Sequence, residues 1–203
     1  MKYAIVSGSH RSNSQSAKVA RFIGKILERE APSSEQFFLD LGNHPLPIWD
    51  EGKWAGEQRW REAWGPISEQ LKQADALIAI SPEWAGMVPP QLKNFFLLCD
   101  QGELAHKPGL IVAVSSSRGG AYPIAELRMS SYKNCFLNWI PDHVIVRNVE
   151  TVLNQPFQAD SKDDQYTQDR LLYSIKILQA YAQALSHVRA SGIIDLSKYP
   201  FGM

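Results

Sequence analysis

Several residues and patterns that mark special classes of protein are scarce in this chain of 203 residues. It has only two cysteines, Cys99 and Cys135, which make neither a Cys-x-x-Cys pair nor a ligand cluster. Both fall in expected helices, and we predict that they are buried, reduced thiols. No set of His, Cys, Asp and Glu has the spacing of metal ligands, so we predict no metal site.

The charges leave no excess of either sign, since 21 Lys and Arg balance 21 Asp and Glu. A net charge of zero argues against a general nucleic-acid binder, which needs a basic excess to displace counterions. Long apolar runs are also missing, because no stretch approaches the roughly 20 residues of a membrane span. The apolar run at 3–6 is too short for the core of a signal peptide. We therefore expect a cytoplasmic protein with no nucleic-acid or membrane partner.

What the chain does contain is an alternation of short apolar segments with segments of helical spacing. Strands are predicted near 3–6, 37–41, 76–80, 110–114 and 143–146. Helices are predicted over 14–29, 57–73 with a kink at Gly65-Pro66, from 90 onward, 123–136 and 163–188. Five strands with intervening helices indicate a parallel sheet in one α/β domain, residues 1–203, which ends in a tail at 191–203.

The loop between the first strand and the first helix has the chemistry of a phosphate cradle. Residues 7–16 read Ser-Gly-Ser-His-Arg-Ser-Asn-Ser-Gln-Ser. A helix N-terminus offers unpaired N–H groups and the positive end of the helix dipole. Serine hydroxyls add donors, and Arg11 can bind phosphate oxygens as a fork. A plain polar turn with a serine cap is the alternative interpretation of these residues.

The same loop excludes two common nucleotide motifs. It has neither the Gly-Lys-Ser/Thr of a Walker A loop nor the Gly-x-Gly-x-x-Gly of a dinucleotide-binding fold. It fits a monophosphate instead, bound where the strand order reverses in a flavodoxin-type sheet. The loops after the third and fourth predicted strands are then the other places where a ligand site is expected.

Three segments together resemble the NADPH-dependent FMN reductase family, which has a flavodoxin-like fold and includes quinone, chromate and azo-dye reductases. Residues 8–14 resemble its Gly-Ser-x-Arg-x-x-Ser phosphate loop. Residues 81–94 resemble its Thr-Pro-Glu-Tyr-Asn-x-Ser-x-Pro-Gly-x-Leu-Lys-Asn stretch, the most specific match. Gly119-Gly120, followed after six residues by Leu127-Arg128, resembles a third segment of the family. The resemblance spans about residues 3–150 and implies a three-layer sandwich with a five-stranded parallel sheet in the order 2-1-3-4-5.

The resemblance also implies the cofactor, FMN, and the residues that hold it. Around its phosphate we expect Ser9, Arg11, Ser14, Gln15 and Ser16. Around its isoalloxazine ring we expect two groups, which are Pro82, Glu83, Trp84, Ala85, Gly86 and Met87, and Ser117, Gly119 and Gly120. Glycine at the last two positions would let the backbone approach a flat ring.

The chain departs from the family pattern in the segments expected around the ring. Ala85 stands where the family usually has asparagine, and Met87 where it has serine, so two polar contacts are missing. Trp84 replaces tyrosine, which keeps an aromatic face without the hydroxyl. The loop after the fourth strand is shorter and carries Arg118. These differences bear on flavin affinity, redox potential and the choice of substrate.

The function that follows is an FMN-dependent NAD(P)H oxidoreductase. It would pass electrons from NADPH or NADH to a quinone, a flavin or a similar small acceptor, and the resemblance implies a homodimer or homotetramer. The cofactor carries the chemistry, so we assign no residue as catalytic. A flavodoxin-like electron carrier and a flavin-free binding or regulatory protein are the alternatives. The zero net charge argues against the carrier, which usually has a strongly acidic face.

Several other residues keep more than one interpretation. His10 is either exposed to solvent or a contact to phosphate or substrate. Glu83 is either an acid or base or, as we prefer, a carboxylate that fixes its loop through backbone N–H groups. Lys93 and Asn94 are expected to fix loop geometry, and Arg128 is a surface residue, a subunit contact or an NADPH ligand. Four tryptophans fit a core or subunit interface as well as a stacking platform, namely Trp49, Trp54, Trp60 and Trp64.

Overall fold

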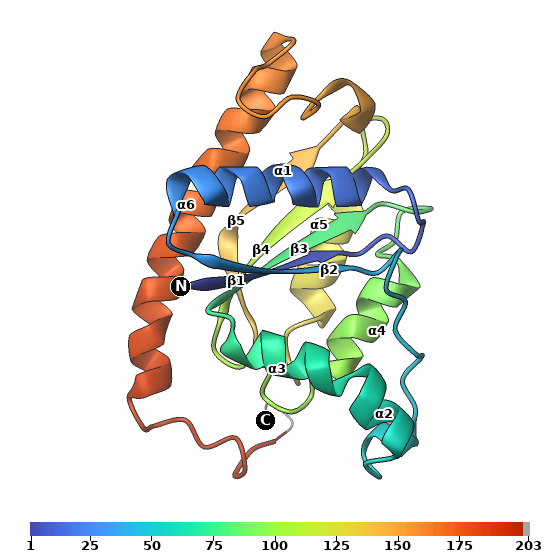
Figure 1. Cartoon of the computed structure of the whole chain (residues 1–203), viewed down its shortest axis with the longest axis vertical. Helices are drawn as coiled ribbons and strands as arrows, with labels where there is room; N and C mark the ends of the chain where they lie inside the picture. The colour runs from blue at the N-terminus through green and yellow to red at the C-terminus, as the bar shows by residue number, and fades with distance from the viewer. Residues whose placement is uncertain (201–203) are drawn as a thin grey trace.

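Five parallel strands form a sheet in the computed structural model, which describes residues 1–200 (Figure 1). They are β1 (Lys2–Ser7), β2 (Glu35–Asp40), β3 (Ala76–Pro82), β4 (Pro108–Val114) and β5 (Asn138–Val146). Their order across the sheet is β2-β1-β3-β4-β5. The predicted fold class and strand order are both confirmed. The end of the expected tail, 201–203, lies outside the described residues.

Helices cover both faces of the sheet and make it the middle of three layers (Figure 1). On one face lie α1 (Gln15–Glu30) and α6 (Lys162–Ala190). On the other lie α2 (Gln58–Ala63), α3 (Gly65–Gln73), α4 (Pro90–Leu98) and α5 (Ala121–Ser130). Two single-turn helices lie in connections, η1 (Glu51–Lys53) and η2 (Val149–Thr151). Within residues 1–200, no helix is both long and apolar enough to cross a membrane.

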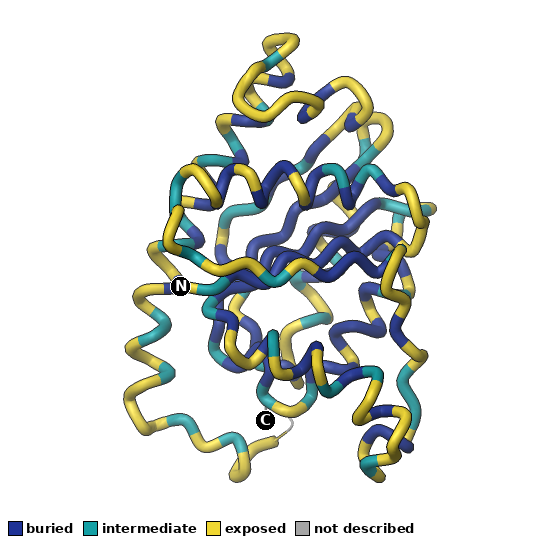
Figure 2. The backbone as a smooth tube through the Cα atoms, viewed as in Figure 1, coloured by how far each residue is buried: buried dark blue, intermediate teal, exposed yellow. Residues whose placement is uncertain are grey.

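Alternate residues of the central strands point into opposite layers. In β3, Ile78 and Ile80 belong to the core under α1 and α6. Leu77 and Ala79 belong to the core on the other face of the sheet. Every residue of β3 and β4 is buried, which explains why both read as continuous apolar runs. Figure 2 shows these strands as the buried centre of the molecule.

The helices follow the predicted periodicity, with one clear difference at a boundary. The predicted kink at Gly65-Pro66 separates α2 from α3, and Pro66 lies in the first turn of α3, where proline is tolerated. The helix predicted to reach residue 136 ends at Ser130 instead. Ser131 Oγ donates to the carbonyl oxygen of Leu127, and such bonds compete with the continuation of a helix.

Both cysteines lie just outside helices, contrary to the prediction, although they are buried and free as expected. Cys99 directly follows α4, and Cys135 lies between α5 and β5 because α5 ends early. Burial raises the pKa of the Cys99 thiol and raises that of Cys135 to about 11. Neither thiol is therefore a reactive thiolate near neutral pH.

A buried lysine before β4 closes the C-terminus of α3. Lys107 Nζ donates to the carbonyl oxygens of Leu71 at 2.7 Å and of Lys72 and Glu103 at 2.8 Å. The last carbonyl groups of a helix have no partner within the helix, so this lysine satisfies them. Burial lowers the pKa of Lys107 to about 8. One side chain thus ties α3 to the start of β4.

Replacing Lys107 with methionine should destabilise the protein, because a side chain of similar length leaves three carbonyl groups without this donor. We expect the free energy of unfolding to fall by about 2–4 kcal/mol. Lys72→Met is the matched control, since Lys72 is a more exposed lysine on α3. Urea denaturation measures both variants. A loss in Lys107→Met no larger than that in the control would contradict this role.

Candidate functional site

Three loops meet at the carboxyl end of the sheet. They are the β1 loop (residues 7–16), the β3 loop (82–87) and the β4 loop (115–120), each named for the strand it follows. β1 lies between β2 and β3, so the strand order reverses at the β1 loop. Every residue predicted to hold FMN lies in one of these loops. The structure therefore brings the predicted residues to a common edge of the sheet.

Side chains of the β3 loop contact the other two loops. The ring of His10 packs edge-on against Trp84, with 4.4 Å between ring centroids. Glu83 Oε2 accepts a hydrogen bond from the backbone N–H of Gly120. His10 is thus exposed, as one interpretation expected, and also contacts the β3 loop. Glu83 fixes its surroundings through a backbone N–H, in agreement with our preferred interpretation.

The β1 loop ends at a capped helix N-terminus. Ser14 has an extended backbone, and its side chain accepts from the N–H of Ala17 at 3.0 Å, which makes it the N-cap of α1. The first turn of α1 carries no acidic side chain. Its N–H groups and the helix dipole favour an anion. The capping role and the phosphate cradle are therefore compatible, because Ser14 caps the helix that would bind the anion.

Two polar atoms at this N-terminus are buried and unpaired. Ser16 Oγ and Gln15 Oε1 have no hydrogen-bond partner among residues 1–200. Buried polar groups are normally paired, so unpaired ones call for an explanation. Ser9 is also buried, and its Oγ accepts from the N–H of Arg11, whose own side chain is exposed beside it. A hydroxyl donor and an exposed guanidinium near a helix N-terminus fit a phosphate group.

The segment after β2 packs against the backbone of the β1 loop, a contact that was not predicted from the sequence. A Cβ on Gly42 would collide with the carbonyl oxygen of Arg11 and lie 3.3 Å from that of Ser9. Only glycine allows this close approach. Asn43 Nδ2 donates to the carbonyl oxygen of Ser12 at 3.4 Å. The Gly-Asn pair directly after a strand is a turn signal that could have indicated this support.

The β3 loop folds back as a two-residue turn. Trp84 and Met87 exchange backbone hydrogen bonds of 3.1 and 2.9 Å. Between them, Ala85 and Gly86 have φ angles of 50° and 74°. Positive φ at both central positions is the geometry of a type I′ turn, in which Asn-Gly is a favoured pair. Ala85 therefore occupies a left-handed position that is unfavourable for alanine.

Residues at the end of β5 fix the β4 loop. Arg147 Nε donates to the carbonyl oxygens of Arg118 at 2.8 Å and Gly119 at 3.2 Å. The N–H of Asn148 donates to the carbonyl oxygen of Ser117 at 3.0 Å. The sequence contains no pattern that marks either residue as part of a site. The conformation of the β4 loop thus depends on Arg147 and Asn148, which were not among the predicted site residues.

α4 and α5 hold the segment that leaves the β3 loop. Lys93 Nζ pairs with Glu126 Oε1 at 2.7 Å, and Glu126 Oε2 accepts from the N–H of Val88 at 2.8 Å. Burial alone would raise the pKa of Glu126, but these two donors outweigh it and lower the pKa. Asn94 Oδ1 accepts from the N–H of Trp49 at 2.8 Å. Lys93 and Asn94 therefore fix loop geometry, as predicted.

Arg128 has a structural contact that none of its three interpretations included. Its guanidinium donates to the carbonyl oxygens of Ile140 and Pro141, both at 2.8 Å. These bonds hold β5 against α5.

Among the described residues, no group of three or more His, Cys, Asp and Glu side chains is placed to hold a metal ion.

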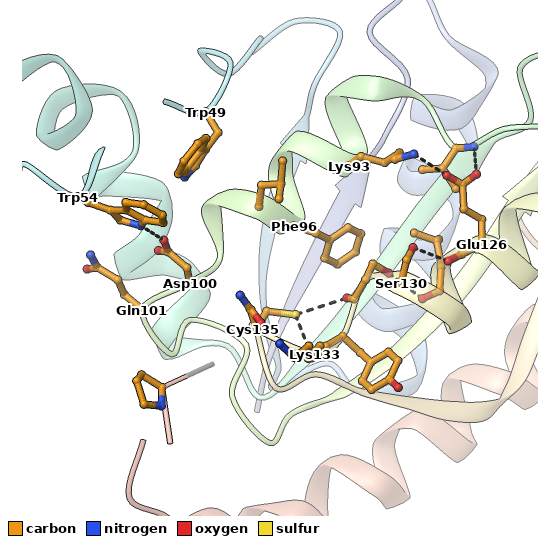
Figure 3. Close-up of a pocket in the computed structure, with 17 residues that line it drawn as sticks. Trp49, Trp54, Lys93, Phe96, Asp100, Gln101, Glu126, Ser130, Lys133 and Cys135 are labelled. Carbon is orange, nitrogen blue, oxygen red and sulfur yellow. Dashed lines mark hydrogen bonds and ion pairs between the residues drawn. The ribbon is translucent and has the colours of Figure 1, made fainter. Parts of the chain in front are cut away.

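A groove of about 790 Å³ lies between α4, α5, the segment after α5 and the segment after β2; it is called the α4–α5 groove below (Figure 3). Its apolar lining includes Trp49, Trp54, Phe96, Leu97 and Leu127. None of the residues predicted to hold FMN lines it. Trp60 and Trp64 are buried in the core instead. The tryptophan cluster is therefore divided between the core and this groove.

The order of the sheet and the polar loop beside β1 define the flavodoxin-like class of α/β protein. Residues 1–151 match the NADPH-dependent FMN reductase family, and the chain belongs to that family. The predicted cofactor, FMN, and the predicted class of enzyme, an NAD(P)H-dependent oxidoreductase, are therefore confirmed at the level of the family.

Relatives in sequence and in structure agree with this assignment. The chain is 25% identical over 146 residues to an NADPH azoreductase of Bacillus sp. (strain OY1-2), covering 72% of this chain and 76% of that protein. It is 32% identical over 124 residues to a quinone reductase of Pseudomonas putida, covering 59% and 62%. FerB from Paracoccus denitrificans, a flavoenzyme NAD(P)H:(acceptor) oxidoreductase, superposes with a TM-score of 0.62 at 21% identity, covering 91% and 94%. The structural likeness shows the shared fold.

The left-handed backbone at Ala85 predicts that Ala85→Asn stabilises the protein. Asparagine adopts positive φ more readily than alanine, so the free energy of unfolding should rise by roughly 0.5–1 kcal/mol. Ala125→Asn on the exposed side of α5 is the control, and it should have the opposite sign because alanine favours a helix. Urea denaturation of the flavin-free proteins gives both values. Equal destabilisation by the two substitutions would contradict the turn geometry.

Proposed function

We propose that this chain binds FMN across the three loops and transfers electrons from NADPH or NADH to a quinone or similar small acceptor. The observation that carries the proposal is the buried, unpaired Ser16 hydroxyl at the N-terminus of α1. The family supports the cofactor and the donor. Relatives named as an azoreductase and a quinone reductase support a small-molecule acceptor.

The N-terminus of α1 would hold the FMN phosphate. Ser9, Arg11, Gln15 and Ser16 lie around this helix end, and Ser14 caps the helix. A phosphate here would give the buried Ser16 hydroxyl its missing partner. The exposed Arg11 guanidinium can add a charge-assisted pair of hydrogen bonds.

The β3 and β4 loops would enclose the isoalloxazine ring. When bound, FMN would supply the redox chemistry, which is hydride transfer from the nicotinamide and electron transfer to the acceptor. The loops bind and orient the ring and shield it from water. With alanine at 85 and methionine at 87, these two positions can offer the ring only backbone polar groups. Glu83 already accepts the N–H of Gly120, which favours a structural role over one as acid or base.

Alanine substitutions at the phosphate end test the proposed binding site. Arg11→Ala and Ser16→Ala should each lower FMN affinity by about tenfold or more, because each removes a hydrogen bond to a charged group. Arg21→Ala is the control, since Arg21 is exposed further along α1. Flavin fluorescence titration measures the dissociation constants. FMN binding by Arg11→Ala and Ser16→Ala as tight as in the wild type would contradict the assignment.

Reduction by NADPH separates the proposed enzyme from its two alternatives. Anaerobic mixing of the FMN-loaded protein with NADPH should bleach the flavin absorbance, and a quinone should restore it. A flavodoxin-like carrier would be bleached slowly or not at all. A flavin-free binding or regulatory protein would show no bound flavin to bleach.

We also propose a cytoplasmic homodimer or homotetramer in which a second copy covers the α4–α5 groove. Apolar side chains in or beside the groove are strongly exposed, with exposed fractions of 65% for Trp54, 60% for Leu97 and 77% for Met129. Apolar and aromatic side chains gathered in this way are typical of protein interfaces. Two buried free thiols fit the reducing cytoplasm.

Leu97→Glu tests whether the groove is a subunit interface. The wild-type protein should sediment as a dimer or tetramer, and the variant should dissociate because a buried, unpaired carboxylate is unfavourable in an interface. Tyr166→Glu is the control, since Tyr166 is 70% exposed on α6, which packs on the opposite face of the sheet. Sedimentation velocity gives the masses. A monomeric wild-type protein, or a variant that remains fully associated, would contradict the proposal.

A further inference from the structure

Glu83 links two loops by capping a helix that begins in the second of them. It directly follows β3, and its Oε2 accepts from the N–H of Gly120, the N-cap residue of α5. Gly120 itself provides no capping side chain. A carboxylate is favourable at a helix N-terminus, where it satisfies an N–H group and faces the positive end of the dipole. Glu83 therefore supplies from β3 the cap that α5 lacks.

The carboxylate also explains one of the two glycines of the β4 loop. A Cβ on Gly119 would lie 2.8 Å from Glu83 Oε1 and 3.2 Å from Oε2. Gly120 has a different reason, since its φ is 107° and a Cβ there would collide with Ile145. Neither glycine needs a nearby flavin ring to account for it. Glycine at 119 is thus explained by the Glu83 carboxylate, which occupies the space that a side chain at 119 would need.

The main chain of Glu83 is fixed as well as its side chain. Its N–H donates to the carbonyl oxygen of Val114, the last residue of β4, at 3.0 Å. The residue is only partly exposed. Glu83 is thus held by its backbone N–H at the end of β4 and by its carboxylate at Gly120. These two hydrogen bonds leave little freedom in the distance between the β3 and β4 loops.

We infer that Glu83 is a positioning residue that sets the spacing of the flavin-ring site by bracing the β3 loop against the β4 loop. This inference rests on the proposed function, because it takes the ring to lie between these loops. A braced pair of loops is ordered before the ring binds, so less conformational entropy is lost on binding. Glu83 acts through Gly119 and Gly120 and not on the reacting atoms.

Riboflavin, which has the ring but lacks the phosphate, separates the two ends of the site. Glu83→Ala should weaken FMN and riboflavin binding by the same factor, about tenfold, because the two loops lose the hydrogen bond that joins them and must be ordered when the ring binds. Arg11→Ala should weaken FMN binding and leave riboflavin binding unchanged. Glu83→Gln keeps an acceptor for the Gly120 N–H and should bind both flavins within about threefold of the wild type.

A double-mutant cycle tests the contact itself. Gly119→Ala should weaken riboflavin binding in the wild-type background, because its methyl group must displace the Glu83 carboxylate. In the Glu83→Ala background the same substitution should have little further effect, since the space is vacant. Additive losses in the two backgrounds would overturn the inference.

The outcomes distinguish this inference from the proposed function. If the wild-type protein binds neither flavin, both fail. If the wild type binds FMN while Glu83→Ala binds both flavins equally well, the inference alone is overturned. Urea unfolding of the flavin-free variants detects a folding defect. Should Glu83→Ala not fold, tight riboflavin binding by Glu83→Gln together with weak binding by Gly119→Ala supports the inference, and unchanged binding by Gly119→Ala overturns it.

Discussion

Burial of the central strands on both faces of the sheet is the constraint on which the rest of this structure depends. Helices cover each side of β3 and β4 so completely that every residue of both strands is buried. A ligand can therefore reach these two central strands only where they end. At the carboxyl end, β1 lies between β2 and β3, and the connections leave in opposite directions. The N-terminus of α1 lies at this point, and its N–H groups and dipole favour an anion there.

The loops at this edge are held by residues from elsewhere in the fold. Gly42 packs behind the β1 loop, Arg147 fixes the β4 loop, and Glu126 holds the exit of the β3 loop. Glu83 then joins the β3 loop to the β4 loop. All of these contacts lie within the protein, so we expect the three loops to be ordered before a ligand binds. Among residues 1–200, the buried Ser16 Oγ and Gln15 Oε1 at this helix end have no hydrogen-bond partner, which supports the proposal that a phosphate binds there.

The fold was predictable from the sequence because its strands and helices differ clearly in periodicity, and the family resemblance supplied the strand order. The candidate site was predictable where its residues follow a strand directly. Contacts between distant segments were not, since nothing near Gly42 or Arg147 in the sequence points to a particular partner. The early end of α5 depends on serine side-chain bonds that propensity alone does not fix. The positive φ of Ala85 was also hidden, because alanine rarely marks a left-handed turn.

A crystal structure of the protein with FMN tests the central claim most directly. We predict phosphate density at the N-terminus of α1, within hydrogen-bond distance of Ser16 Oγ and the Arg11 guanidinium. We predict the ring between the β3 and β4 loops, beside Trp84 and Gly119. Flavin density in the α4–α5 groove, with the α1 N-terminus free of phosphate, would contradict this claim.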